Sequence, residues 1–157
     1  MPTKTDLLRR LSDRIVSEQP GPAVLVVDDD TAITRLCQLT LERAGFRVET
    51  SNDSREALER IESNEYAAIL LDLLMPYMHG ATLLALIGRD KPDVLQRLIV
   101  MTALPEAALA DVRGHVAAVL CKPLQDGEIL QHVRRCVDPN AVAPEIGDAT
   151  AAAHVRV

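Results

Sequence analysis

Polar residues suited to phosphate or metal chemistry stand at the ends of several apolar runs in this 157-residue chain. In chain order they are Asp28 and Asp29, Asp72, Thr102 and Lys122. A single aspartate, threonine or lysine in such a place is more often a helix cap, a turn residue or a solvated side chain. Parallel strands, however, bring their carboxyl ends to one edge of a sheet. Together these residues therefore predict a functional acidic site.

The residue types predict phosphoryl transfer to a carboxylate with the help of a metal ion. Three crowded carboxylates raise one another's pKa values, so the cluster requires a cation. Oxygen ligands suit Mg²⁺, which proteins usually hold with one or two carboxylates and phosphate oxygens. In such a reaction an amine neutralises charge on the phosphoryl oxygens and a hydroxyl donates to one of them. Lys122 and Thr102 fit these two roles.

Five apolar runs of strand type alternate with five segments of helical periodicity. The expected strands cover residues 23–27, 46–50, 67–72, 97–101 and 116–121. This alternation, with short links, predicts an α/β fold: a parallel sheet with right-handed crossovers and helices on both faces. In such a doubly wound sheet the chain reverses direction across the first and third strands, so Asp28, Asp29 and Asp72 should meet in the crevice there.

Local signals place the ends of the helices. Asp30 is the expected cap of the first helix, and Gly45 should end it in the position that follows the C-cap. Asp53 or Ser54 should cap the second helix. A short fourth helix is expected to begin at Pro105, and the last helix should run over about residues 126–137.

Composition indicates one globular domain. The net charge of −6 argues against a general nucleic-acid or membrane-surface binder. The N-terminus lacks an apolar signal core, and no apolar run approaches the ~20 residues that cross a bilayer, so we expect a cytoplasmic protein without membrane insertion. Cys37, Cys121 and Cys136 stand among apolar residues and are expected to be buried, without a disulfide or a zinc ion.

The sequence on either side of the predicted domain, residues 23–137, has a different character. Residues 1–22 contain an amphipathic segment with apolar side chains at helical spacing, followed by a Pro-Gly-Pro break. Packing on its own domain, fraying and dimerisation are all open for this arm, because two turns of seam are too short for a coiled coil. Residues 138–157 are weakly periodic and are expected to form a mobile tail.

Four motifs surround the strand-end residues: VLVVDDD at 24–30, LDLLMPYMHG at 71–80, VMTA at 100–103 and CKP at 121–123. In this order and spacing they resemble the receiver domain of bacterial response regulators. The resemblance implies a flavodoxin-like (β/α)5 fold with strand order 2-1-3-4-5. It also implies that Asp72 accepts a phosphoryl group from a phosphohistidine on a sensor histidine kinase or a histidine phosphotransfer protein.

The resemblance further implies a role for each site residue. Asp29 would bind Mg²⁺ directly and Asp28 largely through water, while Asp72 and the backbone carbonyl of Leu74 complete the metal ligands. Thr102 and Lys122 would contact the phosphoryl oxygens, and the peptide bond between Lys122 and Pro123 would be cis. Such a domain is a phosphorylation-controlled binding module rather than an enzyme, with at most slow autodephosphorylation. Its output would pass to a downstream protein or through a homodimer.

Some positions depart from the family pattern. Val119 stands where an aromatic switch residue is common, so we expect the signal to pass by backbone and loop shifts. His79 replaces an acid that is common before the glycine. Leu74 and Leu104 occupy positions that tune hydrolysis in this family, and we hypothesise that their apolar side chains slow the loss of the phosphoryl group.

Two other functions stay open at this stage. One is a pseudo-receiver scaffold that acts without phosphorylation. The other is a Mg²⁺-dependent phosphohydrolase of the haloacid dehalogenase type, with Asp28 as nucleophile and Asp30 two residues on. Ala32 stands where that family usually has threonine or valine, and the chain lacks length for a cap domain. Nothing after Val137 resembles a helix-turn-helix, so a stand-alone receiver without nucleic-acid binding is expected.

Overall fold

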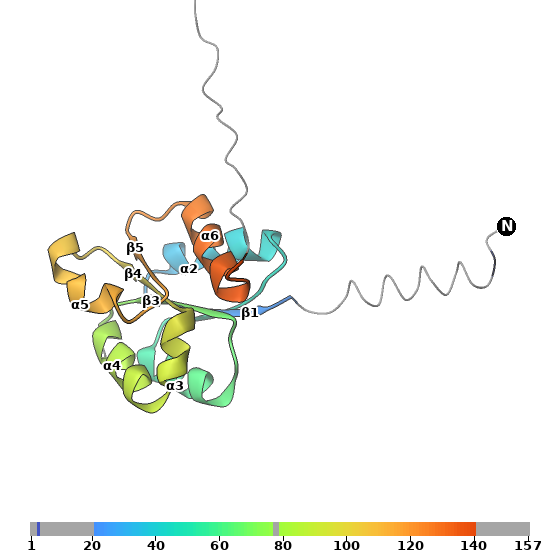
Figure 1. Cartoon of the computed structure of the whole chain (residues 1–157). Coiled ribbons are helices and arrows are strands. Elements are labelled where there is room, and N and C mark those ends of the chain that lie inside the picture. Colours follow the sequence, from blue (N-terminus) through green and yellow to red (C-terminus); the bar gives the residue numbers. More distant parts are fainter. Residues whose placement is uncertain (1–2, 4–20, 77–78, 141–157) are drawn as a thin grey trace, which may run out of the picture.

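The structure is a computed structural model that describes residue 3, residues 21–76 and residues 79–140. Within these ranges five parallel strands form one sheet in the order β2-β1-β3-β4-β5 (Figure 1). The strands are β1 Ala23–Val27, β2 Arg47–Ser51, β3 Ala68–Asp72, β4 Leu98–Thr102 and β5 Ala118–Cys121. The predicted fold and strand order are confirmed, and the strand boundaries differ from the predicted ones by at most two residues.

Helices cover both faces of the sheet. They are α2 Thr31–Arg43, α3 Ser54–Ser63, α4 Gly80–Asp90, α5 Ala110–Arg113 and α6 Asp126–Val137. Helices α2 and α6 pack against each other on one face, and α3 and α4 lie on the other (Figure 1). No helix in the described ranges is long and apolar enough to cross a membrane.

The central strands are buried on both faces, which explains why they are nearly continuous apolar runs rather than alternating ones. In β1, Val24 and Val26 belong to the core beneath α2 and α6. Leu25 and Val27 belong to the core beneath α3 and α4. Successive side chains of a strand point to opposite faces, so β1, β3, β4 and β5 each contribute side chains to both cores. β2 contributes only Val48, to the core beneath α2 and α6.

The predicted helix ends are confirmed at three positions. The Asp30 carboxylate accepts a hydrogen bond from the Ala32 N–H at 2.8 Å, so it caps α2. The Asp53 carboxylate accepts from the N–H groups at the start of α3, at 2.8 and 2.9 Å. Gly45 follows the C-cap of α2 with a φ of 91°, a left-handed conformation that glycine adopts without a Cβ penalty.

The prediction of a short helix that begins at Pro105 is wrong in detail. Glu106–Ala108 form a 3₁₀ turn, Leu109 interrupts it, and only Ala110–Arg113 are α-helical. Leu109 is fully buried, whereas the alanines beside it are exposed. The segment therefore has too narrow an apolar face to stabilise several helical turns by packing.

The expectation that all three cysteines are buried is also wrong. Cys37 is buried on α2, and Cys136 on α6 is half-buried. Cys121 is exposed, because it ends β5, an edge strand in which only Leu120 is buried. An apolar run on an edge strand is less buried than the same run at the sheet centre.

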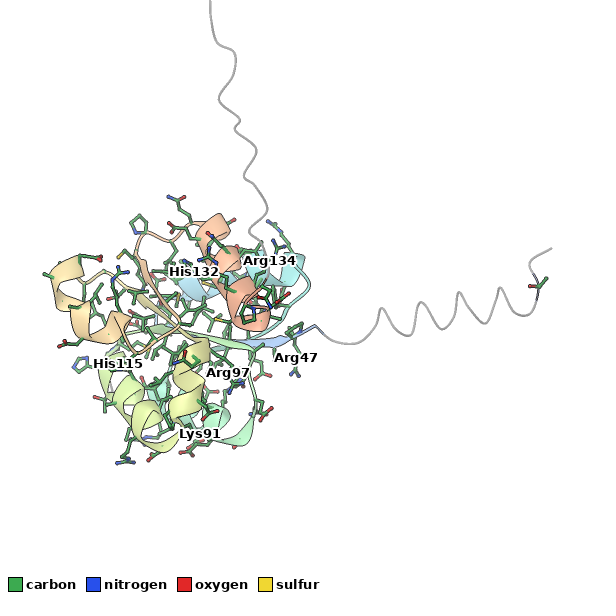
Figure 2. All side chains as sticks on the ribbon, viewed as in Figure 1. Arg47, Lys91, Arg97, His115, His132 and Arg134 are labelled. Atoms are coloured by element: carbon green, nitrogen blue, oxygen red, sulfur yellow. The ribbon has the colours of Figure 1, made fainter. Side chains whose placement is uncertain are left out.

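Two basic side chains tie the segment before β4 to the neighbouring elements. Lys91 Nζ donates to the carbonyl oxygens of Ile61 and Glu62 at the end of α3, at 3.0 Å each. Arg97 donates to the carbonyl oxygen of Tyr66 at 3.0 Å. Figure 2 labels both cations on the side of the sheet where α3 and α4 lie. These bonds satisfy carbonyl groups that the ends of the elements would otherwise leave without partners.

The predicted arm and tail fall largely on residues 4–20 and 141–157, which lie outside the described residues. At the described end of the linker, the Pro22 carbonyl accepts the Arg47 N–H at 3.1 Å. A Cβ on Gly21 would overlap the carbonyl oxygen of Gly45, so the linker packs closely on the turn between α2 and β2.

Candidate active site

The structure brings the sequence-predicted polar residues together at the carboxyl edge of the sheet. Asp28 directly follows β1, Asp72 ends β3, Thr102 ends β4 and Lys122 directly follows β5. The strand register aligns these ends, because Val27 pairs with Leu71, Asp72 with Met101, and Thr102 with Cys121. Together with Asp29, which follows Asp28, five residues from four separate segments therefore lie at one edge of the sheet, and we call the space between their side chains the crevice.

Three carboxylates form the acidic part of the site. Ligand oxygens of Asp28, Asp29 and Asp72 all lie within 4.8 Å of one another. Opposite oxygens around a Mg²⁺ ion are about 4 Å apart, since each lies 2.0–2.1 Å from the metal. Asp28 and Asp72 are 0% and 3% exposed, and Asp29 is exposed. All-oxygen donors at this spacing, open to water on one side, suit a hard divalent cation.

Lys122 supplies the positive charge next to these carboxylates. Its Nζ donates a hydrogen bond to Asp28 Oδ2 at 2.7 Å and lies 3.4 Å from Asp72 Oδ2. Burial raises the pKa of Asp28 above its ordinary value, although the Lys122 bond and charge and the Asp30 N–H act in the opposite direction. Burial acts to lower the pKa of Lys122, but the bond to Asp28 and the charges of Asp28 and Asp72 outweigh it and raise that pKa. The lysine is therefore held as a cation.

The loop after β3 fixes the Asp72 carboxylate. The Leu74 N–H donates to Asp72 Oδ1 at 3.1 Å, so Oδ1 faces the loop and Oδ2 faces Lys122. Gly80, the first residue of α4, packs directly on the backbone here: a Cβ on it would overlap the Asp72 carbonyl oxygen and lie 2.7 Å from Leu73 Cα. The side chain of Leu74 is 48% exposed.

Thr102 is fully buried at the end of β4, the strand that pairs with β3. Its Oγ1 accepts the Leu104 N–H at 3.1 Å, and its carbonyl oxygen accepts the Lys122 N–H at 2.8 Å. Within the described ranges the hydroxyl proton of Thr102 has no acceptor. The hydroxyl can therefore donate to an oxygen of a group that enters the crevice.

The loop between β1 and α2 is held by three local hydrogen bonds. The Asp28 N–H donates to the carbonyl oxygen of Ser51 at 3.1 Å. The Asp30 N–H donates to Asp28 Oδ1 at 2.9 Å, and Asp30 itself caps α2. The peptide bond between Lys122 and Pro123 is cis, as the resemblance implied.

Three features of the site were not predicted. One is the bond from Leu74 N–H to Asp72; an aspartate that accepts from the amide two residues on is a common turn motif, so this bond was predictable. Another is the pairing of Lys122 with Asp28, which depends on loop geometry that no sequence pattern specifies. The last is the contact of Ser51 with Asp28, because nothing in the sequence distinguishes Ser51 from an ordinary strand-end residue.

Val119 is half-buried on β5 and packs against the core beneath α3 and α4. β5 carries no aromatic side chain. Of the described aromatic residues, Phe46 packs against the core beneath α2 and α6, and Tyr66 against the opposite core. Leu104 is half-buried and packs against the same core as Val119.

Comparison with known proteins gives one family. Residues 24–134 match the family model described as the response regulator receiver domain. Among curated proteins, 57 residues, or 36% of this chain, are 44% identical to the transcriptional regulatory protein SrrA of Staphylococcus aureus. That match spans 24% of the length of SrrA, so it concerns one part of the relative only.

Solved structures give the same result over most of the domain. The receiver domain of the Francisella response regulator 1452 is 27% identical with a TM-score of 0.70, over 77% of this chain and 100% of that chain. A CheY-like receiver domain protein from Methanospirillum hungatei is 27% identical with a TM-score of 0.67, over 76% and 95%. The Thermotoga maritima response regulator TrrA, in complex with Mg(2+)-BeF, is 25% identical with a TM-score of 0.65, over 73% and 98%.

Proposed function

The chain belongs to the response regulator receiver domain family, and on this premise we propose that it accepts a phosphoryl group on Asp72 from a phosphohistidine of a partner protein. The observation that carries the proposal is the crevice itself. Oxygens of Asp28, Asp29 and Asp72 lie within 4.8 Å of one another, with Lys122 Nζ 3.4 Å from Asp72. The partner would be a sensor histidine kinase or a histidine phosphotransfer protein.

Asp72 is the acceptor in this proposal because its Oδ2 faces the crevice. That oxygen attacks the phosphorus atom, a P–O bond forms, and the P–N bond to the partner's imidazole breaks. The electron pair of the broken bond stays on the imidazole nitrogen, which takes up a proton. Asp28 is a poorer nucleophile, because its Oδ1 accepts the Asp30 N–H at 2.9 Å and its Oδ2 accepts a hydrogen bond from Lys122 at 2.7 Å.

The acidic residues and the loop carbonyl would hold Mg²⁺. Asp29 is the proposed direct ligand, because it is the exposed member of the cluster, and Asp28 would act largely through water. Asp72 and the carbonyl of Leu74 are the remaining proposed ligands. When bound, the metal supplies positive charge that offsets the charge on the phosphoryl oxygens.

Lys122 and Thr102 would bind the transferred group. Lys122 lies within 3.4 Å of Asp72 Oδ2 and needs only a small movement away from Asp28 to reach a phosphoryl oxygen on Asp72. The Thr102 hydroxyl proton, which has no acceptor among the described residues, gives Thr102 a donor for a second oxygen. Donors that are fixed before the reaction stabilise developing charge without reorganisation.

We propose further that the domain, residues 23–137, acts as a binding module whose phosphorylation changes its protein contacts. A phosphoryl group adds about −1.5 to −2 charge to the crevice. It would accept hydrogen bonds from Thr102 at the end of β4 and from Lys122 in the loop after β5. We propose that a downstream protein or a second copy of the chain binds differently after this change. The segments at residues 1–22 and 138–157 remain predicted extensions of the domain.

Acetyl phosphate with Mg²⁺ tests the proposal directly. The wild-type chain should gain the mass of one phosphoryl group, and the gain should disappear with Asp72→Ala or when a chelator removes Mg²⁺. Asp93→Asn is a matched control, because Asp93 is an exposed aspartate outside the crevice, and this variant should behave as wild type. Light scattering of the same samples reports any change in oligomeric state.

Two outcomes would contradict the proposal. A chain that gains no mass while it still binds partners would be a pseudo-receiver scaffold. Hydrolysis of small phosphate esters that Asp28→Asn abolishes and Asp72→Asn retains would point to a phosphohydrolase instead. The family match and the buried, paired state of Asp28 favour the receiver over the phosphohydrolase.

A further inference from the structure

A chain of polar contacts runs from the start of β3 along β2 and α3 toward the acidic crevice. Tyr66 Oη donates to Glu49 Oε2 at 2.7 Å, and the same carboxylate pairs with Arg60 at 3.1 Å. Arg60 also donates to Glu56 Oε1, at 3.2 Å from Nε and 2.8 Å from Nη2. Glu56 is thereby held on one side by a guanidinium group that is itself anchored to β2.

The other oxygen of Glu56 holds Ser51. The Ser51 hydroxyl lies 2.7 Å from Glu56 Oε2 and 2.9 Å from the Asp53 carbonyl oxygen. Because a hydroxyl has one proton, we assign it to the carboxylate, the shorter and charge-assisted bond. The Ser51 hydroxyl and Arg60 keep the pKa of Glu56 below its ordinary value, so Glu56 is a carboxylate near neutral pH.

Ser51 is the point where this polar chain meets the crevice. It is 3% exposed and is the last residue of β2. Val27 pairs with Ser51 at the end of the β1–β2 ladder, and the Asp28 N–H then donates to the Ser51 carbonyl oxygen at 3.1 Å. The backbone of Asp28 is therefore fixed by a residue that is itself fixed through its hydroxyl.

We infer that Ser51 and Glu56 are positioning residues for the metal-binding aspartates, acting through the Asp28 backbone. The inference rests on the proposed function, since it concerns the Mg²⁺ site of the same crevice. Neither residue is among the proposed ligands of the metal or of the phosphoryl group. The Ser51–Glu56 bond fixes the end of β2, and the end of β2 fixes where Asp28 and Asp29 leave β1.

A purely structural role for the same residues makes a different prediction. Asp53 caps α3, and the Asp53 N–H lies 3.3 Å from Ser51 Oγ, so Ser51 and Glu56 also belong to the N-terminus of that helix. If they served only the helix, their loss would lower stability and leave Mg²⁺ affinity unchanged. Asp53→Ala is the matched control, because it removes the carboxylate that caps α3 through the Arg55 and Glu56 N–H groups and keeps both side chains of the Ser51–Glu56 bond.

The experiment measures Mg²⁺ affinity by calorimetry and the exchange rate of the Asp28 amide by NMR, in the full chain. Ser51→Ala and Glu56→Ala should each weaken Mg²⁺ binding about tenfold, the lower end of the loss seen when residues that support a metal ligand are mutated. Both should also speed Asp28 amide exchange in the absence of metal. Glu56→Gln retains an oxygen that accepts from Ser51, so its affinity should stay near wild type.

The controls separate the possible failures. Asp53→Ala should lower stability while it keeps wild-type Mg²⁺ affinity. Unchanged affinity and exchange in both alanine variants, or an equal loss in Asp53→Ala, would overturn the inference and leave the proposed function in place. If the wild-type chain itself binds no Mg²⁺, the proposed function fails, and the inference fails with it. Because Glu56 is partly exposed, Glu56→Ala remains a test even if Ser51→Ala does not fold.

Discussion

The substitution Lys122→Met tests the electrostatics of the crevice most directly. Methionine keeps an unbranched apolar stem of similar length and removes the charge that lies 2.7 Å from the fully buried Asp28 carboxylate. Breaking a buried ion pair by removing one partner costs about 3–5 kcal/mol. The Lys122 side chain is 20% exposed, so solvent screens part of the loss and we expect about 2–3 kcal/mol at neutral pH without metal.

The pH dependence of this loss has a defined sign. Burial already raises the pKa of Asp28 above 3.8 in the folded protein, and removing Lys122 removes an effect that lowers it. A carboxyl group with a raised pKa binds more protons when folded, so its contribution to stability falls as pH rises from 3.8 through the folded pKa. The difference between wild type and Lys122→Met should therefore shrink toward acid pH.

Added Mg²⁺ should also reduce the difference, since a bound cation restores positive charge next to Asp28. Urea unfolding at about pH 5 and about pH 8, with and without Mg²⁺, measures all of these effects. The matched control is Lys91→Met, because Lys91 Nζ donates to the carbonyl oxygens of Ile61 and Glu62. That variant should lose about 1–2 kcal/mol for its two bonds, with no rescue by Mg²⁺. If the stability lost in Lys122→Met depended on neither pH nor Mg²⁺, the electrostatic reasoning would be refuted.

Three further predictions concern the metal, the loop and the lifetime of the phosphoryl group. Saturating Mg²⁺, at about a hundred times its dissociation constant, should stabilise the wild type by about 2.7 kcal/mol, and Asp29→Asn should lose most of that gain in thermal unfolding. Gly80→Ala should lose about 2 kcal/mol or more and reduce phosphorylation measured by mass, because its Cβ would displace the backbone of Asp72. Gly127→Ala, where a Cβ meets nothing within 4 Å, should leave stability equal or higher. Leu74→Asn should shorten the phosphorylated half-life measured by mass, because an amide can orient an attacking water. A half-life equal to or longer than that of wild type would contradict the hypothesis that the apolar Leu74 side chain slows the loss of the phosphoryl group.

The parts of the fold that the sequence predicts well are those with local physical causes. β1 and α6 are found at their predicted boundaries. β1 is an apolar run that three aspartates follow, and the apolar residues of α6 recur at helical spacing along its length. The caps at Asp30 and Asp53 were predictable, because each carboxylate accepts a hydrogen bond from an N–H only two residues further along the chain. The segment after Pro105 was mispredicted, because its few apolar residues fit either a helix or a bent turn.

The chemistry of the crevice was partly predictable for the same reason. Strand ends in a parallel sheet share one edge, so the convergence of Asp28, Asp72 and Lys122 follows from the topology. Which carboxylate Lys122 contacts does not follow, since 2.7 Å to Asp28 and 3.4 Å to Asp72 differ by less than one atom's width. The role of Ser51 also depends on a contact between β2 and α3 that no residue spacing reveals.

The proposed signal must leave the crevice without an aromatic residue on β5, and the contacts of Thr102 offer a route. The Thr102 hydroxyl oxygen accepts the Leu104 N–H at 3.1 Å, so a shift of Thr102 toward a phosphoryl oxygen would move the Leu104 backbone with it. Leu104 packs against the core that also holds Leu109 and Val112, the apolar residues of the short α5 region. That region has only a 3₁₀ turn and four α-helical residues, so we expect it to be displaced more easily than the longer helices. A backbone shift at Leu104 would thus be expressed at the α5 surface, which makes this surface, rather than a ring on β5, the place where phosphorylation should first alter a protein contact.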